Sequence, residues 1–344
     1  MLVLLAALIA SPVSTEITLP AEPAPLVGTL VMPEGPPKAA VLFVPSPLGG
    51  TAEGDEAYGY IGSAKRTLGE QLAEQGIASV RYAAPPLPDT ASDLSDYGQH
   101  IVGWAGQLAD NTAQSCVWLA SYYQSTLVSH AVARENPKIC GLVAFTPAIT
   151  SPIYDMRIIT DFWHEKFSEL VQPRKAALDD LDRQIAQERN RRRRETLMEI
   201  RTSLEPKDGA ATPEDSLADL EKTRQILSAN ENGEVSELTL SPLNRPISRN
   251  EQRYYITAHP HHLYSLEGWN KPTLVIVENV ASPSEIESVG AYKEESEASI
   301  MVFERLARPS MGPVYAIDDY IPDLPRVPET GVVKAVADFI LTPR

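Results

Sequence analysis

The stretch that decides the fold is residues 116–146, CVWLASYYQSTLVSHAVARENPKICGLVAFT. Its two ends, Cys116–Ala120 and Gly141–Thr146, are short apolar runs of the kind that form buried parallel strands. Thr126–Glu135 lies between them and has the pattern of a helix. A strand, a helix and a second strand in this order predict a βαβ unit within a largely parallel sheet.

The same alternation continues on both sides of this unit. Towards the N-terminus we expect strands at 26–32, 39–44 and 78–82, and helices at 63–75 and at about 93–109. Towards the C-terminus we expect strands at 272–278 and 300–306 and a final helix at 332–341. The predicted fold class is therefore α/β, with a mostly parallel central sheet.

Residues 151–255 differ in composition from the rest of the chain. Charged helix formers surround scattered apolar positions such as Phe162, Trp163 and Leu170, and no strand pattern is evident. We therefore predict a core formed by residues 25–150 and 256–344, with residues 151–255 inserted as a helical cap.

The first fifteen residues resemble a secretory signal peptide. Met1–Ala10 is an apolar run too short to span a bilayer, and the small residues Ser11–Thr15 follow it. We expect residues 1–15 to direct export, which places the protein in the periplasm or outside the cell. In the alternative the run is a buried first strand of a cytoplasmic protein. No later segment has about 18 consecutive apolar residues, so we expect no membrane span.

The formal net charge of −16 argues against nucleic-acid binding, because phosphate backbones require clustered Lys and Arg. The concentrated basic run is Arg191–Arg194. Glu188, Glu195 and Glu199 lie at helical spacing around it, which predicts a solvated, ion-paired helix face.

The chain has two cysteines, Cys116 and Cys140, and each begins an apolar run. We expect two buried free thiols. If the runs are neighbouring parallel strands, the alternative is a disulfide formed in an oxidising compartment. The spacing of cysteines and histidines does not predict a structural zinc site.

Several of these segments resemble one family. Val27–Gly35, Ala39–Val44 and Gly76–Tyr82 are similar to the opening of bacterial α/β hydrolases of the dienelactone-hydrolase and serine-aminopeptidase-like type. The similarity continues through residues 116–147 and from about 256 to the last helix. It implies an α/β-hydrolase fold and a catalytic serine, acid and histidine in that chain order.

The residues at the corresponding triad positions lack the required chemistry. Counting along the resemblance puts Tyr122 at the serine, Ala281 at the acid and Met311 at the histidine. The six histidines all lie at or before residue 262. A histidine that follows the other two triad members therefore has no candidate.

The oxyanion loop of the family corresponds to a segment containing Pro47, Gly49 and Gly50. Proline has no N–H to donate at this position. The two glycines could still offer amides to an anionic ligand. Tyr122 and Tyr123 either stack a ligand in the pocket or fill the core.

Two further groups of residues are candidate sites. His259, His261 and His262 could bind a divalent metal or form a polar loop, and we expect the loop and no metal or cofactor. Ser121 is the alternative nucleophile, although its place before the turn predicts a side chain pointing away from the pocket.

We therefore predict a catalytically degenerate α/β-hydrolase-fold protein that binds a small molecule or a protein partner. The alternative is a serine hydrolase, an esterase or peptidase, with a rearranged active site. A third hypothesis is a scaffold that acts through the charged cap.

Overall fold

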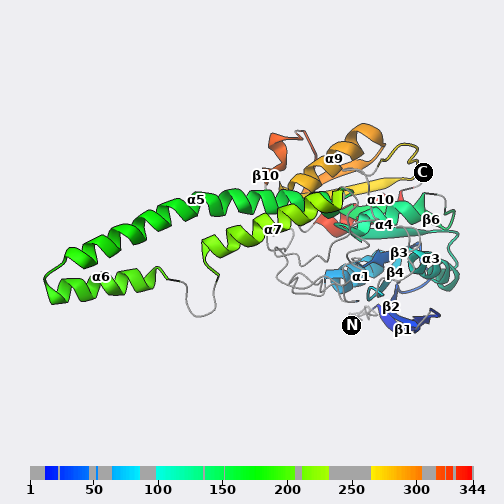
Figure 1. Ribbon diagram of the computed structural model, residues 1–344. Helices are drawn as coiled ribbons and strands as arrows, with labels where there is room; N and C mark the ends of the chain where they lie inside the picture. The colour runs from blue at the N-terminus through cyan, green and yellow to red at the C-terminus, as the bar shows by residue number, and fades with distance from the viewer. Residues whose placement is uncertain are drawn as a thin grey trace, which may run out of the picture. The chain divides into compact units, whose positions relative to one another are not determined.

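The computed structural model describes residues 12–21, 24–45, 52, 64–85, 98–134, 136–150, 152–205, 211–231, 265–303, 315–321, 323–327 and 331–342. Nine strands form one sheet in the order β1-β2-β4-β3-β5-β6-β7-β9-β11 (Figure 1). The strands are β1 (Val13–Leu19), β2 (Leu26–Met32), β3 (Ala39–Val44), β4 (Ile77–Tyr82), β5 (Val117–Tyr122), β6 (Ile139–Phe145), β7 (Thr273–Glu278), β9 (Ser299–Phe303) and β11 (Arg326–Val327).

The sheet is parallel from β4 onward, and β1 and β2 pair antiparallel at one edge. In the described part of this unit the helices are α1 (Ala64–Glu74), α3 (Gln99–Thr112), α4 (Ser125–Ala133), α9 (Pro283–Glu295) and α10 (Val332–Leu341). The predicted α/β class is confirmed. The strands at 26–32 and 39–44 and the helix at 332–341 form with the predicted bounds.

Strand β1 was not predicted as a strand. Val13 pairs with Met32 and Leu19 with Leu26, so the segment extends the sheet beyond β2. It begins inside the stretch assigned to the signal peptide, and residues 1–11 lie outside the described residues. Its side chains are mostly exposed, which explains why no buried apolar run marked it.

The chain divides into two compact units, residues 1–152 with 253–344, and residues 153–252. The second unit contains α5 (Pro152–Gln187), α6 (Arg191–Ser203) and α7 (Pro213–Glu231). Arg201 Nε lies 2.6 Å from Asp182 Oδ1, which joins α6 to the last turns of α5. Arg224 Nε lies 2.8 Å from Asp161 Oδ1, which joins α7 to the first turns of α5.

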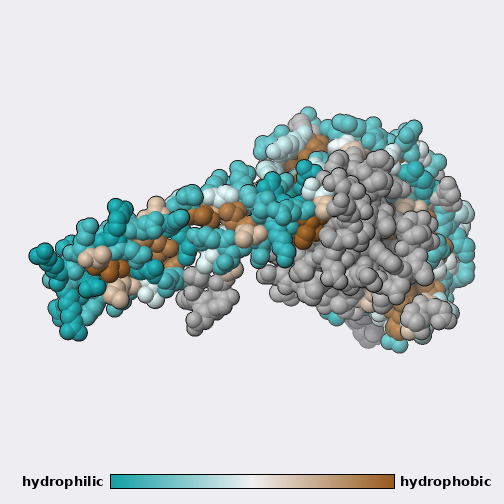
Figure 2. All heavy atoms as spheres, in the orientation of Figure 1, coloured by the Kyte–Doolittle hydropathy of each residue, from teal (hydrophilic) through white to brown (hydrophobic). Residues whose placement is uncertain are grey.

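Pro173 interrupts the backbone hydrogen bonds of α5 between the part that contacts α7 and the part that contacts α6. The next residue, Arg174, reaches Glu214 of α7 at 2.8 Å and the carbonyl of Leu204, just after α6, at 3.4 Å. Hydrophobic residues lie at intervals along these helices, among many hydrophilic ones (Figure 2). In the described part of the chain, no helix has the length and apolar character needed to cross a membrane.

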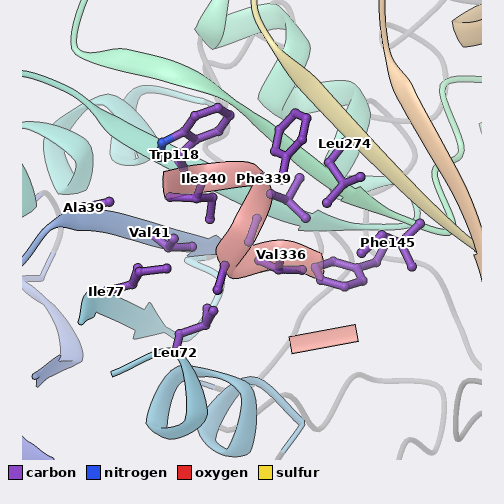
Figure 3. Close-up of a cluster of buried hydrophobic side chains, with 14 of the residues drawn as sticks. Ala39, Val41, Leu72, Ile77, Trp118, Phe145, Leu274, Val336, Phe339 and Ile340 are labelled. Carbon is purple, nitrogen blue, oxygen red and sulfur yellow. The ribbon is translucent and has the colours of Figure 1, made fainter. Parts of the chain in front are cut away.

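The main core lies between the sheet and helices α1 and α10 (Figure 3). Trp118 and Ala120 of β5 point to this face, and Trp118 packs edge-on against Phe339 of α10, with ring centroids 5.5 Å apart. Side chains alternate along a strand, so Val117, Leu119 and Ser121 point to the opposite face. That face is covered by α3 and α4, whose inner residues are buried.

Gly141 gives β6 room to pass Trp118. A Cβ atom at this position would lie 2.3 Å from the carbonyl oxygen of Pro272 and 2.4 Å from the Trp118 ring. We predict that Gly141→Ala lowers the free energy of unfolding by about 1 to 3 kcal/mol, because the added methyl group overpacks the core of the variant. Gly290→Ala in α9 is the control. Nothing lies within 4 Å of its new Cβ, so it should gain up to about 1 kcal/mol. Urea unfolding measures both, and equal effects would contradict the prediction.

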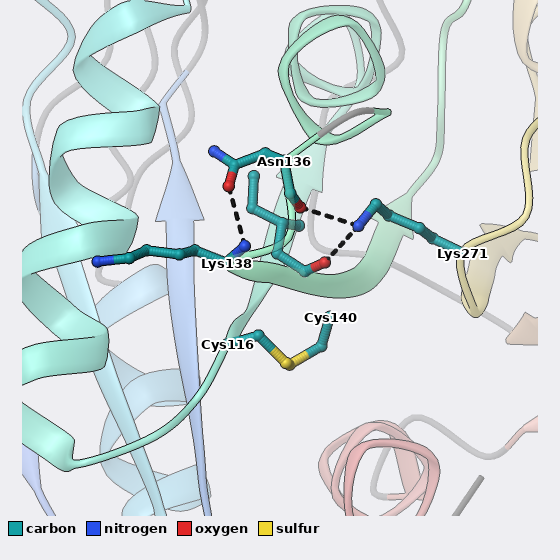
Figure 4. The surroundings of a disulfide bond; sticks show 6 residues. Cys116, Asn136, Lys138, Cys140 and Lys271 are labelled. Carbon is teal, nitrogen blue, oxygen red and sulfur yellow. Dashed lines mark hydrogen bonds between the residues drawn. A yellow bond between two sulfur atoms is a disulfide. The ribbon is translucent and has the colours of Figure 1, made fainter.

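Cys116 and Cys140 form a disulfide (Figure 4), so the expectation of two buried free thiols is wrong. Their Cα atoms are 5.3 Å apart, within the normal range for a bridge. Val117 faces Ile139 and Trp118 faces Gly141, which leaves Cys140 as an extra residue in a bulge. A bulge re-aims a side chain, and here it brings Cys140 to Cys116 at the starts of two neighbouring strands.

We predict that Cys116→Ala with Cys140→Ala lowers the free energy of unfolding by about 3 kcal/mol. The bridge joins residues 24 apart, and closing a loop of this size restricts the unfolded chain by about that amount. Urea unfolding with and without a reductant measures the effect. The wild type should lose stability in the reductant and the double variant should not change. A wild type that is insensitive to reductant would contradict the prediction.

Candidate functional site

The turn between β5 and α4 is the centre of the candidate site. Tyr123 has φ of +51°, a left-handed conformation that is costly for a bulky residue. The resemblance put Tyr122 at the apex of this turn, and the structure places the apex one residue later. The strand begins at Val117 and includes Tyr122, which accounts for the shift of one residue.

Two small residues flank the apex and let the chain reverse tightly. Ser121 and Ser125 stand two positions before and two after Tyr123, where the serine hydrolase motif has glycines. The Ser125 hydroxyl accepts from the backbone N–H of Tyr122 at 2.7 Å and donates to the Tyr122 carbonyl at 2.6 Å. The spacing serine-x-tyrosine-x-serine at 121–125 is the sequence signal that could have located the apex correctly.

The two tyrosines have different surroundings. Tyr122 packs against the core cluster beneath α10, on the same face as Trp118 and Ala120. Tyr123 lies beyond the strand, and its hydroxyl is 3.4 Å from the hydroxyl of Ser284 at the start of α9. Of the two predicted pocket aromatics, Tyr123 therefore lies at the strand ends and Tyr122 fills the core.

The start of α9 supplies the groups next to Tyr123. The hydroxyl of Ser282 accepts from the N–H of Glu285, and the N–H of Ser282 donates to the Glu285 carboxylate at 2.6 Å. This reciprocal capping box leaves Glu285 fully buried. The sequence Ser282-Pro283-Ser284-Glu285 has the signature of such a helix start, which sequence reasoning missed.

Ala281, the residue at the predicted acid position, has only a methyl side chain. It lies in a two-stranded sheet in which β8 (Val280–Ala281) pairs with β10 (Tyr315–Ala316). The nearby carboxylate of Glu278 ends β7 and is 8% exposed. By alternation along β7, Glu278 faces the same side as Leu274 and Ile276, which belong to the core under α10.

Ser121 is buried beneath α4 and is 1% exposed. Its hydroxyl lies 2.5 Å from that of Ser129, which also bonds the carbonyl of Ser125 at 2.9 Å. Ser121 alternates with Ala120 and Tyr122 along β5. Its side chain therefore points to the α4 face and away from the turn, as the sequence predicts.

The segment after β6 closes over the other side of the turn. Thr146 has φ of +39°, and its N–H bonds the carbonyl of Ile276 at 2.6 Å. Further along, the N–H of Ala148 bonds the carbonyl of Tyr123 at 3.3 Å, and the N–H of Ile149 bonds the Ser288 hydroxyl at 2.9 Å. Residues 146–150 are all buried.

The described histidines are His100, His130 and His164. His130 lies in α4, fully buried, and its Nε2 hydrogen-bonds the Tyr292 hydroxyl. Its ring packs edge-on against Trp269, with centroids 4.1 Å apart. Burial, with a smaller effect from the charge of Arg134, lowers the pKa of His130 to about 3. His100 packs against Tyr82, and His164 pairs with Glu221 in α7.

Several predicted site residues lie outside the described residues: Pro47, Gly49, Gly50, Met311, His259, His261 and His262. Within the described part of the chain, no group of three or more His, Cys, Asp or Glu side chains is arranged to hold a metal ion. The described site therefore consists of a strained tyrosine, buried serines and a buried capping carboxylate.

The topology and the turn together define the class of protein. The strand order β1-β2-β4-β3-β5-β6-β7-β9, with β2 antiparallel to its neighbours, is that of an α/β-hydrolase fold. The left-handed residue between β5 and the following helix is in the position of that fold's nucleophile elbow. The chain thus has an α/β-hydrolase fold, and Tyr123 is the left-handed residue in the turn after β5.

Comparison with known proteins gave matches to solved structures only. A dienelactone hydrolase from Anabaena variabilis matches with 12% identity, a TM-score of 0.41 and coverage of 96% of this chain and 95% of that one. A proline iminopeptidase from Mycobacterium smegmatis has 12% identity, a TM-score of 0.48 and coverage of 95% and 97%. A thermophilic esterase from Thermogutta terrifontis has 16% identity, a TM-score of 0.43 and coverage of 96% and 98%. No family model and no curated protein matches the sequence.

The buried His130 makes a prediction about acid stability. Its imidazole stays neutral in the fold down to about pH 3, whereas in the unfolded chain it takes up a proton near pH 6.5. Stability is therefore lost as the pH falls from 6.5 towards 3, and His130 accounts for about 2.5 kcal/mol of that loss between pH 7 and pH 4.5.

His130→Gln removes the titrating group and keeps an amide that can bond Tyr292. Urea unfolding at the two pH values should show a smaller loss for this variant than for the wild type. His164→Gln is the control, because His164 belongs to the other unit, where it is partly exposed and pairs with Glu221, and it should keep the wild-type loss. An unchanged loss in His130→Gln would rule out this role.

Proposed function

We propose that this protein uses the α/β-hydrolase fold to recognise a small molecule or a protein partner and does not hydrolyse esters or amides. The observation that carries the proposal is Tyr123 at the elbow. Its left-handed backbone puts a phenol where the fold's enzymes have a serine. A phenol with an ordinary pKa of about 10 is a poor nucleophile unless a base activates it.

The serines near the elbow do not supply a substitute nucleophile. The hydroxyls of Ser121 and Ser125 are buried and bonded to a neighbouring serine and to backbone, respectively. Ser284 contacts Tyr123 but is 3% exposed. A general base for any of them would be an imidazole, and the described histidines lie elsewhere. The absence of a histidine after residue 262 supports the same conclusion.

An exposed aromatic surface supports a binding role. Tyr315 and Tyr320 are 39% and 57% exposed, and their rings lie edge-on with centroids 5.8 Å apart. Val280, which is 44% exposed, belongs to the strand that pairs with Tyr315. This strand leads directly into the start of α9, where Ser284 meets Tyr123. Exposed tyrosines that keep a polar hydroxyl are typical of recognition surfaces.

We propose further that the protein works in an oxidising compartment outside the cytoplasm. The Cys116–Cys140 bridge supports this location, because disulfides persist in secreted and periplasmic proteins and are rare in the cytosol. The signal peptide expected in residues 1–15 is consistent with it.

We predict that the purified chain neither reacts with a fluorophosphonate probe nor hydrolyses short-chain aryl esters above the buffer blank. Mass spectrometry of the intact protein measures labelling, and absorbance of the released phenol measures turnover. An active serine esterase is the positive control. Ser121→Ala and Ser284→Ala should give the same blank result. Stoichiometric labelling that either substitution removes would contradict the proposal.

The second candidate is a hydrolase with a rearranged active site. The observation that favours it is the strain at Tyr123, because costly left-handed conformations of bulky residues cluster at functional sites. In that case Tyr123→Phe, which removes only the hydroxyl, would abolish ester turnover and the Ser121→Ala variant would keep it. A blank result for the wild type excludes both outcomes for the esters tested.

A further inference from the structure

Helix α6 buries none of its residues fully, although it contains several large apolar ones. Met198, Ile200 and the following Leu204 are 51%, 45% and 42% exposed. Leu170 of α5 is 55% exposed. A short helix is only marginally stable by itself in water. It needs other protein atoms packed against its apolar face to remain folded. The hairpin of α5 and α6 is therefore incompletely packed within one chain.

The second half of α5 presents a regular seam to α6. Val171, Arg174, Leu178, Leu181 and Ile185 recur at alternating spacings of three and four residues, the pattern of helices that pack along their length. Each of these residues is only half-buried. Two helices bury one narrow seam, whereas four helices enclose a core.

Three of these four exposed apolar residues lie on one side of the hairpin. Ile200 and Leu204 are four residues apart and share one side of α6, while Met198 faces another direction. The bond from Arg174 to the carbonyl of Leu204 places Leu204 beside the α5 turn that follows Leu170. Ile200, Leu204 and Leu170 form what we call the arm stripe.

The two ends of the α5–α6 hairpin carry opposite charge. Residues 188–195, at the turn between α5 and α6, contain five arginines and two glutamates. Arg191 pairs with Glu195 at 3.0 Å and Arg193 with Glu188 at 3.9 Å. Arg189, Arg192 and Arg194 have no acidic partner among the described residues. We call residues 188–195 the basic tip.

The opposite end is acidic. Residues 161–170 and 211–221 together contain seven carboxylates and one lysine. The ion pair between Arg174 and Glu214 at 2.8 Å puts the start of α7 beside the middle of α5. Glu169 and Glu205 flank the arm stripe itself. Their side chains are 57% and 49% exposed, and they pair with Lys166 and Arg201, respectively. We call Glu169, Glu205, Glu214 and Asp215 the acidic base.

We propose that the arm stripe binds the arm stripe of a second copy of this chain, with the two hairpins antiparallel, so that four helices enclose one core. Charge complementarity selects this occupant. An antiparallel pair related by a two-fold axis brings each basic tip to the acidic base of the other copy, and does so twice. A parallel pair would bring tip against tip. The proposal is independent of the elbow and of whether the protein hydrolyses esters.

Sedimentation velocity of the full chain over a range of micromolar concentrations tests the proposal. The wild type should form a dimer. Ile200→Glu with Leu204→Glu should raise the dimer dissociation constant by at least about 100-fold, because it puts charge into the apolar centre of the interface. Met198→Glu is the matched control: it has similar exposure on the same helix, faces another direction and should leave the dimer intact.

Charge reversal tests the antiparallel arrangement. Arg192→Glu with Arg194→Glu should weaken the dimer, and added salt should weaken the wild-type dimer. Adding Glu169→Arg and Glu205→Arg to the same chain reverses both ends and should restore the dimer. Circular dichroism checks that every variant keeps its helices.

A wild type that is monomeric at all concentrations would overturn the proposal. So would a dimer that the stripe variant leaves intact, or one that Met198→Glu disrupts as strongly as the stripe variant does. Failure of the dimer to re-form when both charged ends are reversed would also overturn it. Binding of a different protein to the stripe of a monomeric chain would also overturn it.

Discussion

Strand β5 is buried on both faces and must reverse into α4 within two residues, and the geometry of the candidate site follows from this constraint. One face of the strand carries Trp118, Ala120 and Tyr122 into the core under α10, while the other carries Ser121 beneath α4. Neither face has room for the chain to turn gradually. The reversal therefore occurs in a single left-handed residue, Tyr123, between two small serines that let strand and helix approach closely.

The same constraint explains why the serines near the elbow are structural. A serine in the narrow space between a strand and a helix has no water to bond, so its hydroxyl must bond to protein atoms. Ser125 bonds the backbone of Tyr122, and Ser121 bonds Ser129. Tyr123, which projects past the strand ends towards Ser284, is the side chain that the turn presents.

The sequence predicts the sheet well because burial dictates it. Strands such as β3 are apolar throughout, so they can be recognised without knowledge of distant contacts.

The site is predicted less well because it depends on single-residue register. The apex moved from Tyr122 to Tyr123, and the bulge that brings Cys140 to Cys116 depends on how β6 passes the Trp118 ring at Gly141. The capping box at Ser282 has a local signature, but its meeting with Tyr123 joins segments 161 residues apart. Strand β1 was missed because most of its side chains are exposed. Its backbone pairing with β2 makes it a strand, and its sequence has no apolar pattern to indicate one.

Pro173 gives α5 a mechanical property that a continuous helix would lack. The helix has 36 residues, about 54 Å at the usual rise, and proline removes one backbone hydrogen bond near its middle. On one side of that point α5 is braced by α7, and on the other by α6. The two halves of α5 thus rely on different partner helices, and the missing bond lies where the support passes from α7 to α6.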